Sequence, residues 1–156
     1  MHTQTESHVA QKLHYSTFAV GPFAVLVWHE RISVEGVESV ARVFARLSEA
    51  HAEKGFGFLT IIENEADVST SPAARNAMSK ALTDHERCLR AAAIAYEADG
   101  FKATIVRSVV TAINLIAGAR FPNRVFRDNR EALKWLGQKL DFKDLDRQPQ
   151  LQRYLR

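Results

Sequence analysis

The segment Phe56–Ile62 constrains the fold more than any other part of the sequence, because it is apolar on both faces of an extended chain. A strand of this kind is typical of the centre of a parallel sheet that helices cover on each side. Parallel strands also need crossover connections, which are usually helices. This segment therefore predicts an α/β fold.

The other predicted strands are 14–20, 23–28, 89–96 and a short last one at Val125-Phe126. Gly21-Pro22 separates the first two, which is typical of a tight turn between antiparallel strands. Helices are expected after the later strands, where the sequence places residues that start or stop a helix. The expected starts are Ser33, Ser71 before Pro72, Asp99 and Asp128, and the expected stops include Gly55 and Gly118.

This order of elements predicts a single, mainly parallel sheet of about four to five strands, with helices on both faces and an antiparallel first strand at one edge. The length of 156 residues and an average composition favour one compact domain. We assign 1–12 to an N-terminal tail, 13–140 to the domain and the polar stretch 141–156 to a C-terminal tail.

Charge and cysteine content narrow the class of protein further. The formal net charge is only +3, and Cys88 is the single cysteine. A lone cysteine excludes an internal disulfide and a multi-cysteine metal site, and it favours a cytoplasmic setting. No secretory signal begins the sequence, and no apolar stretch reaches the roughly 20 residues that a membrane-spanning helix needs.

The end of the predicted domain carries a recognisable pattern. After the strand at Val125-Phe126 come the acidic cap Asp128, an acidic-Ala-Leu step at Glu131 and a Trp-Leu pair at Trp135. With the element order of residues 13–140, this ending resembles the STAS-like domains of bacterial anti-sigma-factor antagonists and related bacterial proteins. The resemblance implies a STAS-like α/β fold.

A second point of resemblance is the loop that contains Asp67, Ser69, Thr70 and Ser71. It follows a central strand, where phosphorylatable antagonists carry an Asp-Ser-Ser/Thr-Gly motif; here the glycine is missing and Pro72 follows Ser71, so the match is one of position. The resemblance implies that this loop faces a protein partner, an anti-sigma or kinase-like regulator, and that phosphate on a serine breaks the complex. The residues also fit a simpler role in which Ser71 only caps the next helix.

The predicted helix 100–117 has an unusually wide apolar face. Phe101, Ile105, Val109 and Ile113 form one stripe, and further apolar residues such as Leu115 widen it. Such a face exceeds what one side of a sheet covers, so it predicts a ligand-pocket wall at these four residues or a homodimer. Coverage of the second side by the C-terminal tail is the alternative.

Several other groups of polar residues are expected to lie on the solvated surface. Acidic residues follow the predicted strands, among them Glu63, Glu65 and Glu97, but charged loops are usually only solvated. The histidines lack metal-ligand spacing, and no phosphate-loop, dinucleotide or nucleophile-elbow motif occurs. We therefore predict no metal, no cofactor and no catalytic residue. The arginines at 120, 124, 127 and 130 are interpreted as a solvated face, so nucleic acid is not an expected partner.

These observations and the resemblance together predict a non-enzymatic, regulatory, protein-binding domain of STAS type, with serine phosphorylation as the implied switch. The alternative is a small-ligand or lipid-binding module of the same fold.

Overall fold

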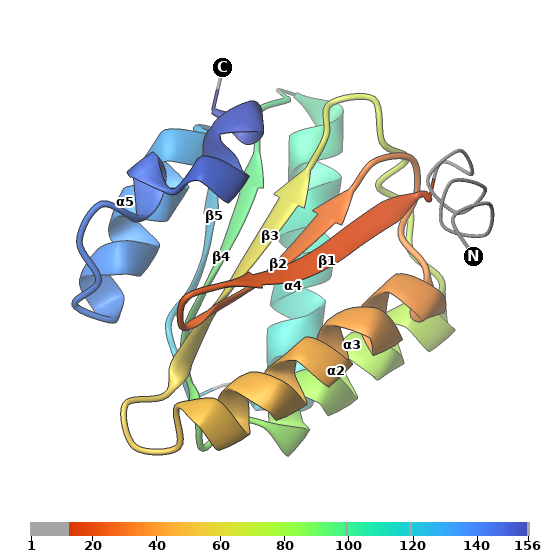
Figure 1. The fold of residues 1–156 in the computed structure, drawn as a ribbon. Helices are drawn as coiled ribbons and strands as arrows, with labels where there is room; N and C mark the ends of the chain where they lie inside the picture. The colour runs from red at the N-terminus through yellow and green to blue at the C-terminus, as the bar shows by residue number, and fades with distance from the viewer. Residues whose placement is uncertain (1–12, 99, 119, 156) are drawn as a thin grey trace, which may run out of the picture.

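The computed structural model describes residues 13–98, 100–118 and 120–155. Five strands form one mixed sheet in the order of the chain (Figure 1). They are β1 (Tyr15–Val20), β2 (Phe23–Trp28), β3 (Phe56–Ile62), β4 (Leu89–Tyr96) and β5 (Asn123–Phe126). β1 is an edge strand antiparallel to β2, and the other pairs are parallel. The predicted sheet is confirmed.

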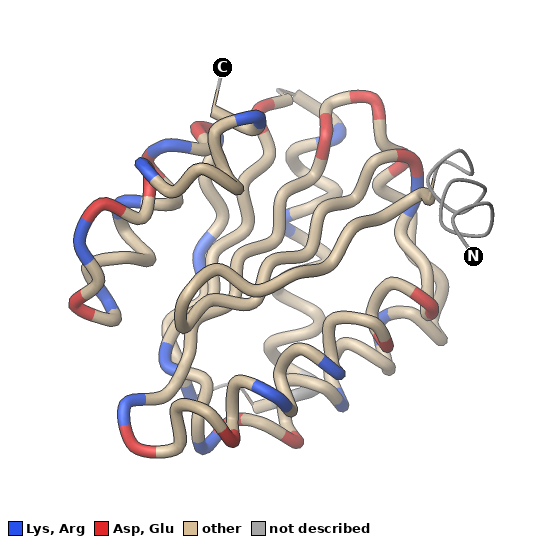
Figure 2. Tube along the Cα trace, viewed as in Figure 1, with Lys and Arg blue, Asp and Glu red and all other residues tan. Residues whose placement is uncertain are grey.

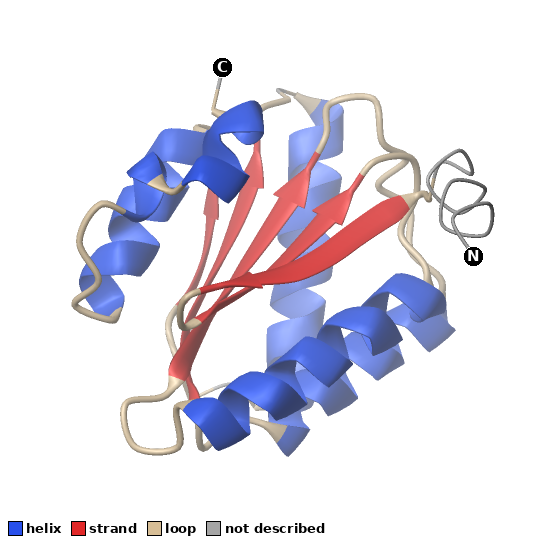
Figure 3. Cartoon of the chain, in the orientation of Figure 1, coloured by secondary structure: helices blue, strands red, loops and turns tan. Residues whose placement is uncertain are grey.

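Helices cover both faces of the sheet unequally (Figure 3). α2 (Val34–Ala50), α3 (Pro72–Asp84) and α4 (Phe101–Ala117) lie on one face. Each of them connects neighbouring parallel strands, and right-handed crossovers between strands in sequential order keep their helices on the same side. α5 (Asn129–Lys139) lies on the opposite face with two 3₁₀ helices, η1 (Leu145–Arg147) and η2 (Pro149–Tyr154).

The sheet separates two apolar cores. Along β2, Leu26 and Trp28 contribute to the core under α2, α3 and α4, whereas Val25 and Val27 contribute to the core under α5. All of β2 and β3 is buried. Figure 2 shows that these strands carry no charged residue, whereas charged residues occur along the helices and in the loops around the sheet. Burial on both faces is what the composition of β3 predicted.

Three of the expected helix caps are formed. Ser33 Oγ accepts the Gly36 N–H at 3.1 Å, Ser71 Oγ accepts the Ala74 N–H at 3.0 Å, and Asp128 caps α5. The expected stop at Gly55 is wrong, because α2 ends at Ala50 and Gly55, with φ of +80°, belongs to the turn into β3. The expected cap Asp99 lies outside the described residues.

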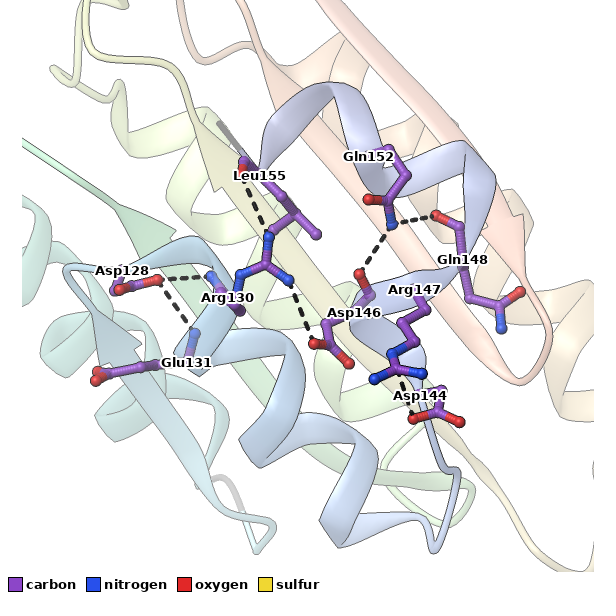
Figure 4. Close-up of polar contacts among 9 residues, drawn as sticks. All are labelled: Asp128, Arg130, Glu131, Asp144, Asp146, Arg147, Gln148, Gln152 and Leu155. Carbon is purple, nitrogen blue, oxygen red and sulfur yellow. Dashed lines mark hydrogen bonds and ion pairs between the residues drawn. The ribbon is translucent and has the colours of Figure 1, made fainter.

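The polar tail expected from residue 141 onward is also wrong, because this segment completes the second core. Leu145 and Leu151 are 2% and 1% exposed and pack with the side chains of α5 and the sheet. Polar contacts hold the segment in place (Figure 4): Arg130 of α5 pairs with Asp146 at 3.4 Å and donates to the Leu155 carbonyl. The charged residues therefore form the outer surface of a packed segment.

Candidate functional site: an apolar cavity walled by the serine loop

The segment of residues 67–71, which we call the serine loop, joins β3 to α3 and is anchored at its start. The Asp67 N–H donates to the Glu30 carbonyl at 2.7 Å, and the Val68 side chain is buried. Asp67 Oδ1 accepts both the Ser69 N–H, at 2.9 Å, and the Ser69 hydroxyl, at 2.7 Å. These hydrogen bonds favour the carboxylate and hold the pKa of Asp67 below its ordinary value.

The end of the serine loop is fixed by α3. Ser71 caps this helix, and Arg75 Nη1 donates to both the carbonyl oxygen and the hydroxyl oxygen of Thr70, each at 2.9 Å. Ser69 and Ser71 remain exposed, whereas Thr70 is half-buried. The loop thus presents two accessible serine side chains on an ordered backbone.

An apolar cavity of about 80 Å³ lies behind this loop. Its wall combines the sheet with α2, α3 and α4, and the main apolar residues include Trp28, Phe58, Ile62, Met78, Val109 and Ile113. Val68 and Thr70 of the serine loop complete the wall. Arg75, Thr60 and Asn123 add polar groups to an otherwise apolar lining.

Asn123 is the polar group of the cavity whose hydrogen bonding is incomplete. Its Nδ2 donates to Asn114 Oδ1 at 2.9 Å, while its own Oδ1 is buried without a partner among the residues that the structure describes. Most buried polar atoms in proteins have a hydrogen-bond partner. Asn123, a lining residue, therefore keeps one acceptor without a partner in the described part of the chain.

The residues predicted as a pocket wall have different environments. Val109 and Ile113 line the cavity, and Ile105 packs against the core beside it. Phe101 is 80% exposed, so its assignment to the wall is wrong. Phe101 is the first residue of α4 and lies next to the loop after β4, where no preceding helical turn holds its side chain against the sheet.

The remaining predictions concern metal binding, membrane-spanning helices and the surface arginines. Among residues 13–98, 100–118 and 120–155, no group of three or more His, Cys, Asp or Glu is arranged to hold a metal ion. No helix in these ranges is long and apolar enough to cross a membrane. Of the arginines interpreted as a solvated face, Arg124 stacks over Phe126 and Arg130 holds the C-terminal segment.

The strand order, the antiparallel edge strand and the arrangement of helices define a SpoIIAA-like, that is STAS-like, α/β fold. The chain is similar to an uncharacterised DUF3478-family protein from Shewanella loihica PV-4, whose crystal structure has a SpoIIAA-like fold. The TM-score is 0.51 and the identity 18%, covering 81% of this chain and 97% of that one. No family model and no curated protein matches the sequence. The predicted fold is confirmed, and at this identity the likeness concerns the fold alone.

Proposed function

We propose that this chain is a binding domain whose apolar cavity takes a small molecule with an apolar body and one polar end. The observation that carries the proposal is about 80 Å³ of free space lined mainly by apolar side chains, with few polar groups among them. Apolar side chains that face free space lack dispersion contacts on that side. An apolar ligand restores these contacts.

Two residues that line the cavity fit a ligand with a polar end. The unpartnered Asn123 Oδ1 needs a donor, such as a hydroxyl or a protonated carboxyl group. Arg75 also lines the cavity, and its guanidinium carries more N–H donors than the one that holds Thr70. A short-chain alcohol or carboxylic acid satisfies both residues, and a lipid acyl chain belongs to the same chemical class.

Thermal unfolding of the full chain with hexanol or hexanoic acid tests this proposal. A ligand at a hundred times its Kd stabilises the folded state by about 2.7 kcal/mol and raises the unfolding midpoint. Val109→Phe should fill the cavity and abolish the rise, whereas Leu115→Phe, at a position 78% exposed on the same helix, should preserve it. An equal rise in wild type and Val109→Phe, or no rise in wild type, contradicts the proposal.

A second function, regulated binding of a protein, is supported by the exposed serines of the loop. Ser71 lies at the N-terminus of α3, where the helix dipole stabilises negative charge. Phosphate there adds about −1.5 to −2 charges on a surface that an anti-sigma or kinase-like partner would contact. The loop would then work as a switch that releases the partner.

This second function is tested with a partner captured by affinity purification and then purified itself. Ser69→Asp and Ser71→Asp should weaken binding by more than tenfold, about 1.4 kcal/mol, while Ser71→Ala should not. Gln150→Ala, at an exposed position of the C-terminal segment on the opposite face of the sheet, serves as the control. Equal affinity of wild type and both aspartate variants, measured by titration calorimetry, excludes the switch.

A further inference from the structure

A continuous chain of hydrogen bonds joins three side chains on the face of the sheet opposite the apolar cavity. Ser16 Oγ lies 2.7 Å from His29 Nε2, and His29 Nδ1 lies 2.8 Å from Glu63 Oε1. Ser16 is in β1, His29 directly follows β2 and Glu63 directly follows β3. These strands are neighbours in the sheet, so their register brings the three residues together.

The order of these groups, a hydroxyl, an imidazole and a carboxylate, is the order that activates a serine as a nucleophile. A carboxylate beside Nδ1 fixes the tautomer that carries a proton on this nitrogen, which leaves the lone pair of Nε2 facing the serine hydroxyl. Nε2 is then placed to accept the Ser16 proton as a general base. The same sequence of hydroxyl, imidazole and carboxylate recurs in serine hydrolases on unrelated folds.

A polar cleft of about 380 Å³ adjoins the relay formed by Ser16, His29 and Glu63, at the carboxyl ends of the strands. His29 and Glu63 form part of its wall, together with Asn129 and Tyr154. Asn129 is 9% exposed, and its Oδ1 has no partner in the described part of the chain. Burial raises the pKa of Tyr154, with Arg153 acting in the lowering direction and the Glu63 carboxylate in the raising direction.

The edge position of β1 gives access to the nucleophile. Ser16 is half-buried, and its strand has β2 on one side and no other strand of the described residues on the other. The His29 N–H donates to the His14 carbonyl, so residues 14 and 16 direct their backbone groups toward β2. The N–H of Thr17 then points to the open edge, because backbone groups alternate along a strand. It is a donor for negative charge that develops beside Ser16.

We propose that Ser16, His29 and Glu63 form an acyl-transfer site that cleaves esters of small acyl groups. Ser16 Oγ attacks the carbonyl carbon and gives its proton to His29 Nε2. The bond from this carbon to the alcohol oxygen then breaks, and the alcohol leaves with that proton. Water attacks the acyl-serine in the same way, so that an acid is released and the Ser16 hydroxyl is restored.

The charges of the cleft indicate which acyl groups enter it. Glu63, Glu65 and Glu97 line it with a single cation, Arg153, among the described lining residues. This excess of negative charge disfavours an anionic acyl group. The substrate class is therefore a neutral or cationic ester, and 4-nitrophenyl acetate should react faster than the 4-nitrophenyl half-ester of succinic acid.

The chain contains its own matched control. His14 Nε2 lies 2.7 Å from Ser33 Oγ, so a second serine and histidine meet at the same distance. Ser33 Oγ already accepts the Gly36 N–H as a helix cap, and no described carboxylate is hydrogen-bonded to His14. Ser16 should therefore react with a serine-directed electrophile and Ser33 should not.

The test is treatment of the full chain with a fluorophosphonate, followed by peptide mass analysis. The Ser16 oxygen forms a bond to phosphorus and fluoride leaves, giving an adduct that water does not remove. Labelling should occur on Ser16, be unchanged in Ser33→Ala, and fall at least about a hundredfold in His29→Gln, the lower end of a general-base contribution. Labelling of neither serine, or of Ser33 as readily as Ser16, overturns the proposal.

Glu63 is a positioning residue in this scheme, so it is tested by conservative rescue. Glu63→Asp should retain part of the labelling, and Glu63→Gln should lose most of it while keeping a similar unfolding midpoint. Release of 4-nitrophenol from 4-nitrophenyl acetate should disappear in Ser16→Ala. Unchanged release in Ser16→Ala, or equal labelling of the Asp and Gln variants, contradicts the acyl-transfer site.

Discussion

Arg75 holds Thr70 through two hydrogen bonds from one nitrogen, Nη1, to the carbonyl and hydroxyl oxygens at 2.9 Å each. The first residues of α3 are thereby connected to the end of the serine loop. Both residues also line the apolar cavity. The loop and the cavity are therefore one structural unit, and a ligand in the cavity would contact the backbone that presents Ser69 and Ser71.

Removing the donors of Arg75 should loosen this unit. Arg75→Met keeps the length of the side chain but loses both hydrogen bonds, which should lower the free energy of unfolding by about 1–2 kcal/mol. Amide hydrogen exchange at Ser69 and Thr70 should become faster, while exchange in β2 stays slow. Arg75→Lys, which retains a donor, is the matched control. Unchanged exchange in Arg75→Met would show that the loop holds its conformation without this contact.

The cap at Ser71 should be separable from any signalling role. Ser71→Ala removes the acceptor for the Ala74 N–H and should cost about 1 kcal/mol in the free energy of unfolding. Ser71→Asp should cost little, since aspartate also caps and its charge suits the helix N-terminus. Urea unfolding of the two variants checks this difference. Equal loss in both would mean that the hydroxyl has a role beyond capping.

The hydrogen bonds of Asp67 imply a dependence on acid. Because the pKa of Asp67 is lowered in the folded state, its contribution to stability is present above the ordinary value of 3.8 and is lost as pH falls through the folded-state pKa. In Asp67→Asn this part of the acid dependence should be absent. Unfolding midpoints measured from about pH 5 downward compare the two proteins. The same acid dependence in both would contradict the role of Asp67 in fixing Ser69.

Local signals account for what the sequence predicted correctly. Ser33, Ser71 and Asp128 cap helices through residues two or three positions away, so sequence spacing suffices to find them. The burial of β3 on both faces likewise follows from its own composition. These local features supported the prediction of a mainly parallel sheet covered by helices, whereas the order of its strands comes from the structure.

The relay from Ser16 to Glu63 shows what spacing could not reveal. Its members are separated by 13 and 34 positions, and only the register of three strands brings them together. Sequence spacing could not reveal the unpartnered Oδ1 of Asn123 either, because it is a consequence of tertiary packing. The one available signal was that His29 and Glu63 both follow strands, where ligand sites of parallel sheets gather.

The sequence does not reveal the packing of the C-terminal segment, because its apolar residues have no helical period. Phe142, Leu145 and Leu151 lie among charged residues, yet they pack on the second core. Gly137 permits this return of the chain, since a Cβ there would lie 2.8 Å from the Phe142 carbonyl oxygen. The Phe142 ring then contacts Phe23 edge to face, with 5.2 Å between ring centroids.

Truncating a buried leucine of this segment should therefore destabilise the whole domain. Leu151→Ala should lower the free energy of unfolding by about 2–5 kcal/mol, as for other buried leucines. Gln150→Ala, at the exposed neighbouring position, is the control and should change it by less than about 0.5 kcal/mol. Denaturant unfolding of both variants is the measurement. A Leu151→Ala variant as stable as wild type would show that the segment packs without contributing to stability.

The exposed apolar side chains of α4 lead to the last prediction, which is self-association. Phe101 and Leu115 are 80% and 78% exposed, and the C-terminal segment packs on the opposite face, so it cannot cover them. Burying each such side chain in an interface contributes roughly 1.5–3 kcal/mol, and twofold symmetry uses each one twice. We expect concentration-dependent dimers in sedimentation equilibrium and at least tenfold weaker association in Phe101→Ser with Leu115→Ser. Lys102→Ser, an exposed polar change beside Phe101, is the control. A wild-type protein that stays monomeric at all concentrations would contradict the dimer and leave these side chains as ordinary exposed surface.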